Sequence, residues 1–138
     1  MKKGKKMERY KVILVDDEAE VIDMIEKKIH WNDLGFEVAG SATNGVKALE
    51  LVEKLQPDVV LTDIKMPYMD GLELSRRLNR EYPNIYIMLC TGFDEFEYAK
   101  EAVHLEIKEY MLKPVNATEL SESLTNLKHT LDREREEN

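Results

Sequence analysis

The sequence has 138 residues, the length of one domain, with 35% charged residues and a formal net charge of −8 at pH 7. This acidic balance argues against direct nucleic-acid binding by the domain, because phosphate contacts need clustered Lys and Arg. The apolar runs are strand-sized and far short of a membrane span, so we expect a cytoplasmic protein with no membrane partner. The single cysteine, Cys90, lies inside an apolar run and is expected to be a buried core thiol.

The chain divides into three predicted segments. Residues 1–9 begin with a lysine-rich stretch and are expected to form a flexible basic tail. Residues 10–131 carry the periodic apolar patterns of a single folded domain. Residues 132–138 are expected to form a charged extension, frayed from Arg133 to Asn138.

Five short runs rich in apolar and β-branched residues predict strands, at residues 10–15, 36–41, 58–63, 85–91 and 110–112. Helical spacing of apolar residues predicts helices between and after them, at residues 19–29, 44–55, 72–82, 94–105 and 120–131. In the fourth helix we expect inward positions at Phe96, Tyr98, Ala99 and Val103. Residues 30–35 are expected to be a loop in which Trp31 and Leu34 fold back on the first helix.

The alternation of strands and helices predicts an α/β fold, a doubly wound five-stranded parallel sheet with five helices distributed over both faces. The central run, residues 58–63, is a short apolar stretch rich in β-branched residues that ends in Asp63, as expected for a strand buried on both faces. In such sheets ligands bind outside the carboxyl ends of the strands. Asp63 therefore lies where chemistry is usually done.

Polar residues follow four of the predicted strands at that same edge. Asp16 and Asp17 end the first strand, Asp63 the third and Thr91 the fourth, and Lys113 follows the fifth. Three carboxylates in one crevice repel one another unless a cation lies among them, and hard oxygen ligands favour Mg²⁺ or Mn²⁺. With an ammonium and a hydroxyl added, the group has what is needed to receive a phosphoryl group.

Each of these residues also has a purely structural interpretation. Asp63 could organise the turn that follows it, and Asp17 has the spacing of a capping box with Glu20. Lys113 could be a surface lysine and Thr91 an ordinary strand residue. These alternatives remain open from the residues alone, although their coincidence at the ends of four strands favours a site. The histidines, His30, His104 and His129, share no spacing typical of metal ligands.

Four motifs resemble the receiver domain of bacterial two-component response regulators, over roughly residues 10–127. They are Val-Asp-Asp-Glu at 15–18, Thr-Asp-Ile-Lys-Met-Pro at 62–67 with Met-Asp-Gly at 69–71, Thr-Gly at 91–92 and Lys-Pro at 113–114. The resemblance implies a flavodoxin-like sheet of strand order 2-1-3-4-5.

The resemblance also implies roles for the acidic residues. Asp63 would accept a phosphoryl group from a sensor histidine kinase. Asp17, Asp63 and the main-chain carbonyl of Lys65 would bind Mg²⁺, with Mn²⁺ a possible substitute, and Asp16 would hold a metal-bound water. The chain would then be a signalling switch that catalyses only its own phosphorylation and dephosphorylation.

Further roles follow for residues on the later strands. Lys113 would pair with the phosphoryl oxygens, and its bond to Pro114 would be cis. Thr91 and Tyr110 would be the switch residues, with Thr91 moving towards the phosphoryl group and Tyr110 turning inward behind it. Phe93 and the side chain of Lys65 occupy positions that tune phosphoryl lifetime in this family.

A finer resemblance lies in residues 31–36, Trp-Asn-Asp-Leu-Gly-Phe, and residues 92–99, Gly-Phe-Asp-Glu-Phe-Glu-Tyr-Ala. Both are similar to receivers fused to AraC-type DNA-binding domains, which implies transcription regulation through a C-terminal output domain beyond residue 138. The partners would be the kinase and either that output domain or a second receiver. Contact would be made through the helix at 94–105, the fifth strand and the last helix.

Two other functions on the same architecture are disfavoured by particular residues. An aspartyl-phosphate hydrolase typically needs a second acid two residues after its nucleophile, where this chain has Lys65. A flavin or nucleotide site needs a phosphate-cradling loop after the first strand, where this chain has the acidic residues 16–18. A stand-alone receiver that acts through protein contacts is the remaining alternative.

Overall fold

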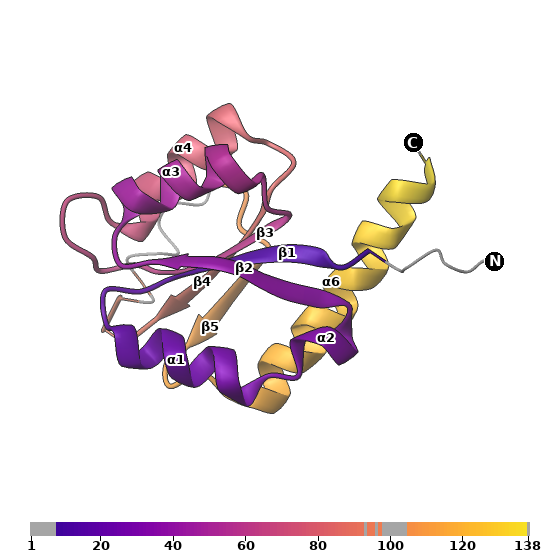
Figure 1. The fold of residues 1–138 in the computed structure, drawn as a ribbon. Coiled ribbons are helices and arrows are strands. Elements are labelled where there is room, and N and C mark those ends of the chain that lie inside the picture. The colour runs from indigo at the N-terminus through magenta and orange to yellow at the C-terminus, as the bar shows by residue number, and fades with distance from the viewer. Residues whose placement is uncertain (1–7, 93, 96, 98–104, 138) are drawn as a thin grey trace.

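A computed structural model describes residues 8–92, 94, 95, 97 and 105–137 (Figure 1). Its five strands form one parallel sheet of order β2-β1-β3-β4-β5, as the resemblance implied. The strands are β1 (Tyr10–Val15), β2 (Phe36–Ala42), β3 (Val59–Asp63), β4 (Tyr86–Thr91) and β5 (Glu109–Leu112). Each predicted strand is therefore confirmed, with ends that differ from the prediction by no more than one residue.

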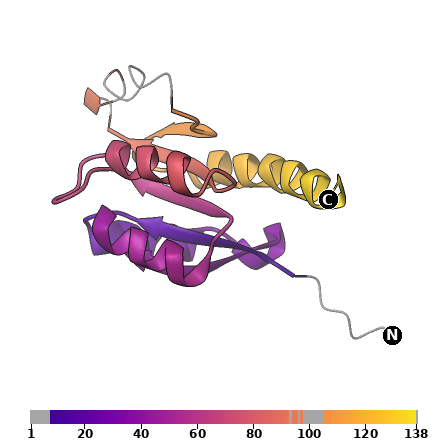
Figure 2. The same cartoon turned by 90° about the horizontal axis from the view of Figure 1, so that it is seen from above.

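Helices cover both faces of the sheet (Figures 1 and 2). One face carries α1 (Ala19–Lys28), α2 (Trp31–Leu34) and α6 (Ala117–Glu137), and the other carries α3 (Gly45–Leu55) and α4 (Gly71–Glu81). This arrangement confirms the doubly wound fold. None of the described helices is long and apolar enough to span a membrane.

Alternating side chains of the strands fill a separate apolar core on each face. On β1, Val12 and Leu14 pack with residues of α1 and α6, whereas Ile13 and Val15 pack with residues of α3 and α4. Every residue of β3 is buried, as expected for the central strand of a sheet with two covered faces. The apolar layers hold β3 rigidly, and with it the carboxylate at its end.

The predicted loop at residues 30–35 is wrong in part, because Trp31–Leu34 form the single helical turn α2. Trp31 is buried and its indole Nε1 donates a hydrogen bond to the carbonyl oxygen of Glu26 at 3.1 Å. Gly35 ends the turn with φ of +90°, a conformation that favours glycine. Trp31 and Leu34 do pack against the core as expected, but one turn is too short to give a periodic pattern.

The prediction of a frayed end is also wrong, since α6 continues without a break to Glu137. The apolar stripe stops at Leu131, so periodicity could not reveal the last turns. For the predicted helix at 94–105, residues 94, 95 and 97 are helical, while Phe93, residues 98–104 and the inward positions proposed there lie outside the described residues.

Candidate functional site

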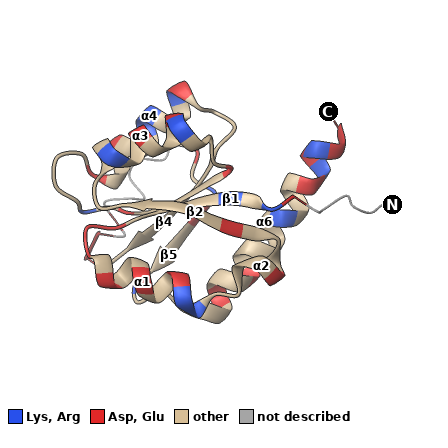
Figure 3. Cartoon of the chain, viewed as in Figure 1, with Lys and Arg blue, Asp and Glu red and all other residues tan. Residues whose placement is uncertain are grey.

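Three carboxylates meet at the carboxyl edge of the sheet, where β1 and β3 end. Asp16, Asp17 and Asp63 each offer an oxygen that lies within 4.8 Å of the other two. Figure 3 shows the acidic turn between β1 and α1 at this edge. Asp16 and Asp63 are buried and Asp17 is exposed, so the group has one open side. The sequence-predicted cluster is therefore assembled by the fold.

Lys113, which follows β5, lies between the two buried carboxylates. Its Nζ is 2.9 Å from Asp16 Oδ2 and 3.2 Å from Asp63 Oδ2. Burial by itself lowers the pKa of Lys113, but the hydrogen bond to Asp16 and the charge of Asp63 raise it above its usual value. The ammonium thus stays charged and partly neutralises the pair. The Lys113–Pro114 bond is cis, as the resemblance implied.

The single positive charge of Lys113 does not neutralise the three carboxylates, and burial and the remaining repulsion raise the pKa of Asp63. Burial and then the charge of Asp16 raise the pKa of Asp63 to about 6, although Lys113 and the amide of Ile64 act in the opposite direction. The amide hydrogen bond is real and short, from Ile64 N to Asp63 Oδ1 at 2.8 Å. A further cation beside Asp63 would relieve this cost, and carboxylate oxygens are the ligands that Mg²⁺ or Mn²⁺ prefer. The donor set therefore fits such an ion.

The chain after Asp63 folds tightly back over the end of β3. Gly71 donates its N–H to the carbonyl oxygen of Ile64 at 2.7 Å, and a Cβ at Gly71 would lie 2.1 Å from the main-chain oxygen of Asp63. Asp70 then caps α4 by accepting a hydrogen bond from the amide of Glu73 at 2.8 Å. Asp70 and Gly71 thus let α4 begin directly beside the site, and they hold the segment between Asp63 and Gly71 close to the end of β3.

Asp17 does not cap α1, and the predicted capping box is wrong. Glu18 occupies the N-cap position without a side-chain hydrogen bond. Asp16, not Asp17, organises this turn, because its Oδ1 accepts a hydrogen bond from the amide of Glu18 at 2.9 Å. Glu18 and Asp16 thus carry the turn, and the exposed Asp17 carboxylate remains available to a ligand.

Thr91 ends β4 one residue beyond the position paired with Asp63, which is Cys90. Its side chain is fully buried, and its hydroxyl donates a hydrogen bond to the carbonyl oxygen of Gly92 at 3.0 Å. Cys90 is also buried, as predicted, and this burial raises the pKa of its thiol to about 12. Tyr110 lies half-buried on β5, next to β4. The fold therefore brings Thr91 and Tyr110 onto adjacent strands.

Sequence reasoning did not foresee one ion pair at the mouth of the site. Lys65 is exposed, and its Nζ lies 3.8 Å from Oε2 of Glu95, which comes from the segment after β4. No spacing rule joins these two residues, because the contact depends on strand order. The histidines that the structure describes, His30 and His129, belong to no cluster able to hold a metal.

The sequence model of the response regulator receiver domain family matches residues 12–125 of this chain. The chain belongs to this family. Over 91% of this chain, the sequence is 42% identical to the uncharacterized transcriptional regulatory protein YesN of Bacillus subtilis. Over 94% of this chain, it is 33% identical to the transcriptional regulatory protein HptR of Staphylococcus aureus. It spans 34% and 50% of those two relatives, respectively.

Solved structures agree with the finer resemblance. The receiver domain of AraT from Geobacillus stearothermophilus matches with a TM-score of 0.87 and 39% identity, covering 91% of this chain and 98% of that one. A two-component transcriptional regulator AraC from Clostridium phytofermentans matches with a TM-score of 0.84 and 30% identity, again covering 91% and 98%. The receiver is thus similar to those of AraC-type regulators, in the class of signalling switches rather than conventional enzymes.

Proposed function

We propose that Asp63 is the phosphoacceptor of this receiver. A carboxylate oxygen of Asp63 attacks the phosphorus of a phosphohistidine on a sensor kinase, the P–O bond forms, the P–N bond breaks, and the histidine leaves as neutral imidazole after taking a proton. The observation that carries the proposal is the convergence of Lys113 on Asp16 and Asp63 at one open edge of the sheet. That arrangement supplies charge at the place where phosphoryl oxygens would lie.

We assign the divalent ion, Mg²⁺ or Mn²⁺, to Asp17, Asp63 and the main-chain carbonyl of Lys65, with Asp16 accepting from a bound water. When bound, the ion supplies positive charge to neutralise the phosphoryl oxygens. Asp17 is the exposed member of the group, so its carboxylate is the first ligand that an ion entering from solvent would meet. Before an ion binds, the Lys113 ammonium reduces the electrostatic repulsion between the Asp16 and Asp63 carboxylates.

The same proposal assigns the switch to Thr91 and Tyr110. Phosphorylation replaces the single charge of the Asp63 carboxylate with about two negative charges on the phosphoryl group, beside the carboxylates of Asp16 and Asp17. The Thr91 hydroxyl, now bonded to the carbonyl of Gly92, would turn to the phosphoryl group, and Tyr110 would move inward on the neighbouring strand. Phe93 and Lys65 would set how long the phosphoryl group persists.

The output would be a change in the surface made by the segment 94–105, for which the sequence predicts a helix, together with β5 and α6. In the cytoplasm this surface would bind the protein's own C-terminal DNA-binding domain or a second receiver, and so regulate transcription. The names of the relatives support a transcriptional role, and their greater length supports a further domain. A stand-alone receiver that binds another protein is the alternative, whereas Lys65 disfavours an aspartyl-phosphate hydrolase.

Phosphoryl labelling tests the proposal directly. Purified protein is incubated with acetyl phosphate, with and without Mg²⁺, and the adduct is measured by intact mass. We expect one phosphoryl group on the wild type with Mg²⁺, and none on the Asp63→Asn variant or in the presence of a chelator. Asp23→Asn, a change to an exposed acid on α1, is the matched control and should label normally. Equal labelling of the Asp63→Asn variant would refute the assignment.

A further inference from the structure

The amino-terminal edge of the sheet, opposite the acidic site, holds a second set of polar contacts. Tyr10 begins β1 and Tyr86 begins β4. The Tyr10 hydroxyl donates a hydrogen bond to Asp132 Oδ1 at 2.5 Å, and the Tyr86 hydroxyl donates one to Glu134 Oε2. Both acceptors lie in the part of α6 that extends past the apolar stripe.

Other contacts reinforce the two tyrosine bonds. The guanidinium carbon of Arg135 lies 4.7 Å from the centre of the Tyr10 ring, within the range of a cation–π interaction. The second oxygen of Asp132 accepts a hydrogen bond from Lys128 Nζ at 2.8 Å. Because Asp132 bonds both Lys128 and Tyr10, its pKa lies below its usual value. The carboxylate is therefore ionised and able to accept both hydrogen bonds.

Helix geometry places the two tyrosine-bonded acids, Asp132 and Glu134, on opposite sides of the face of α6 that packs on the sheet. Leu131 is buried and faces the sheet. At about 100° per residue, Asp132 lies to one side of Leu131 and Glu134 to the other, while Arg135 falls close to the line of Leu131. Bonds on both sides of the buried residue oppose rolling of the helix about its axis, which a single contact would permit.

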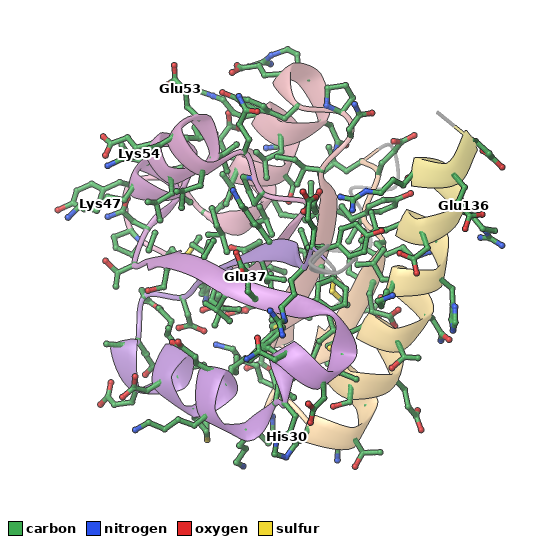
Figure 4. All side chains as sticks on the ribbon, turned by 45° about the vertical axis from the view of Figure 1, so that its right-hand side comes forward. His30, Glu37, Lys47, Glu53, Lys54 and Glu136 are labelled. Atoms are coloured by element: carbon green, nitrogen blue, oxygen red, sulfur yellow. The ribbon has the colours of Figure 1, made fainter. Side chains whose placement is uncertain are left out.

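The composition of this segment shows that the helix needs such contacts. Glu134, Glu136 and Glu137 lie near the carboxyl end, where the helix dipole disfavours negative charge, and the basic Arg135 of the last turn offsets only part of this. The last turn of a helix without tertiary contacts frays. Figure 4 shows Glu136 directed away from the body of the domain, in contrast to the buried face of the same helix. The side-chain contacts of Asp132, Glu134 and Arg135, rather than local preference, therefore maintain residues 132–137.

We propose that Tyr10 and Tyr86 clamp residues 132–137 to the sheet and so make the end of α6 a rigid element that sets the direction of an attached output domain. The clamp rests on the contacts of this chain alone, and its use by an output domain rests on the proposed function. Tyr10 and Tyr86 are positioning residues, since they lie at the opposite edge of the sheet from Asp63.

Hydrogen exchange measured by mass spectrometry tests the clamp. Tyr10→Phe, Tyr86→Phe and the double variant remove the hydroxyls and keep the rings. We expect amide protection in residues 133–137 to fall by about tenfold in the double variant, while peptides from β1 and β3 keep theirs. Tyr68→Phe, the same chemical change on a side chain that is 90% exposed, should leave the exchange of α6 unchanged.

A distance measurement tests whether the direction of the helix is fixed. Spin labels are placed on Glu53→Cys in α3 and Glu136→Cys in α6, two exposed positions (Figure 4). Native Cys90 is buried with a raised pKa and will not compete for the label. We expect a narrow distance distribution that broadens when both tyrosines become phenylalanine.

Wild-type protection at residues 133–137 no greater than that of a fraying helix would overturn the clamp. So would a distance distribution that the double variant leaves unchanged. Neither experiment involves phosphorylation, so failure here leaves Asp63 as the proposed phosphoacceptor. Conversely, a failure of Asp63 to label would leave the clamp standing.

Discussion

The two edges of the sheet use carboxylates in opposite ways. At the carboxyl edge, Asp16 and Asp63 share one ammonium, and the fold keeps Asp63 at a cost that appears as its raised pKa. At the amino edge, Asp132 and Glu134 accept hydrogen bonds from tyrosines and hold a helix in place. The first edge stores unfavourable charge for a ligand to relieve, and the second uses charge to tie the structure together.

The difference arises from what faces each carboxylate. At the amino edge the Tyr10 hydroxyl and the Lys128 ammonium both donate to Asp132, whereas the acids at the carboxyl edge face one another. Substitutions at the two edges should therefore shift stability in different directions. Changes that remove charge at the carboxyl edge should stabilise the ion-free protein, and changes that remove donors at the amino edge should destabilise it.

The largest effect is expected from steric crowding at Gly71. A Cβ there would lie 2.1 Å from the main-chain oxygen of Asp63, so β3 or the start of α4 must shift. We expect Gly71→Ala to lower the free energy of unfolding by more than about 3 kcal/mol, measured by urea denaturation. Gly92→Ala is the control, because the nearest atom to its added Cβ is a side-chain oxygen of Glu95 at 3.9 Å. Equal losses in both variants would contradict this explanation.

The next effect is a gain of stability from removing the acid at the site. The pKa of Asp63 is raised from 3.8 to about 6, so between these pH values the folded protein binds more protons than the unfolded chain. Its free energy of unfolding therefore falls as pH rises through this window, by up to about 3 kcal/mol for a shift of roughly two pKa units. Asp63→Asn abolishes this titration and should stabilise the protein at pH 7 in metal-free buffer.

Thermal unfolding at several pH values checks this prediction. The stabilisation by Asp63→Asn should be small near pH 4, reach its full size by pH 7, and shrink when Mg²⁺ is added to both proteins, because the ion offsets the repulsion only in the wild type. Asp23→Asn, at an exposed position, should show no such pH dependence. A variant less stable than the wild type at pH 7 without metal would contradict the assignment of charge repulsion at this edge.

How far the sequence predicted each edge follows from the kind of signal it contains. The carboxyl edge was predictable, because Asp16, Asp63 and Lys113 come directly after apolar runs, and parallel strands end at one edge. Asp17 shows the limit of local spacing. Its position relative to Glu20 fits a capping box, yet the turn is organised by Asp16 instead.

The amino edge could not be predicted by the same reasoning. Tyr10 and Asp132 are separated by 122 positions, and their contact depends on where the last helix crosses the sheet. Residues 132–137 carry no apolar stripe, so they resembled a frayed tail even though they form part of a packed helix. Lys65 and Glu95 are a similar case at the carboxyl edge, since only strand order brings them together.

A smaller loss is expected when one tyrosine of the clamp changes. Tyr10→Phe removes the hydrogen bond to Asp132 and should lower the free energy of unfolding by about 1 kcal/mol at pH 7. Burial, and then the bond to Asp132, raise the pKa of Tyr10 from 10.0 to about 12. Its contribution is therefore complete below pH 10 and is lost as pH rises to about 12. Denaturation at pH 7 and pH 11 should show the variant approaching the wild type at the higher pH.

The smallest effect is expected where the amino edge meets the chain that enters β5. Asn79, in the last turns of α4, accepts a hydrogen bond from the amide of Glu106 at 2.7 Å and donates one to its carbonyl oxygen at 3.3 Å, as a neighbouring strand would. Both bonds are exposed, so Asn79→Ala should cost less than about 1 kcal/mol overall. Hydrogen exchange should nevertheless quicken around residues 105–108. Exchange that quickened equally in β1 would mean that Asn79 supports the whole sheet rather than this single junction.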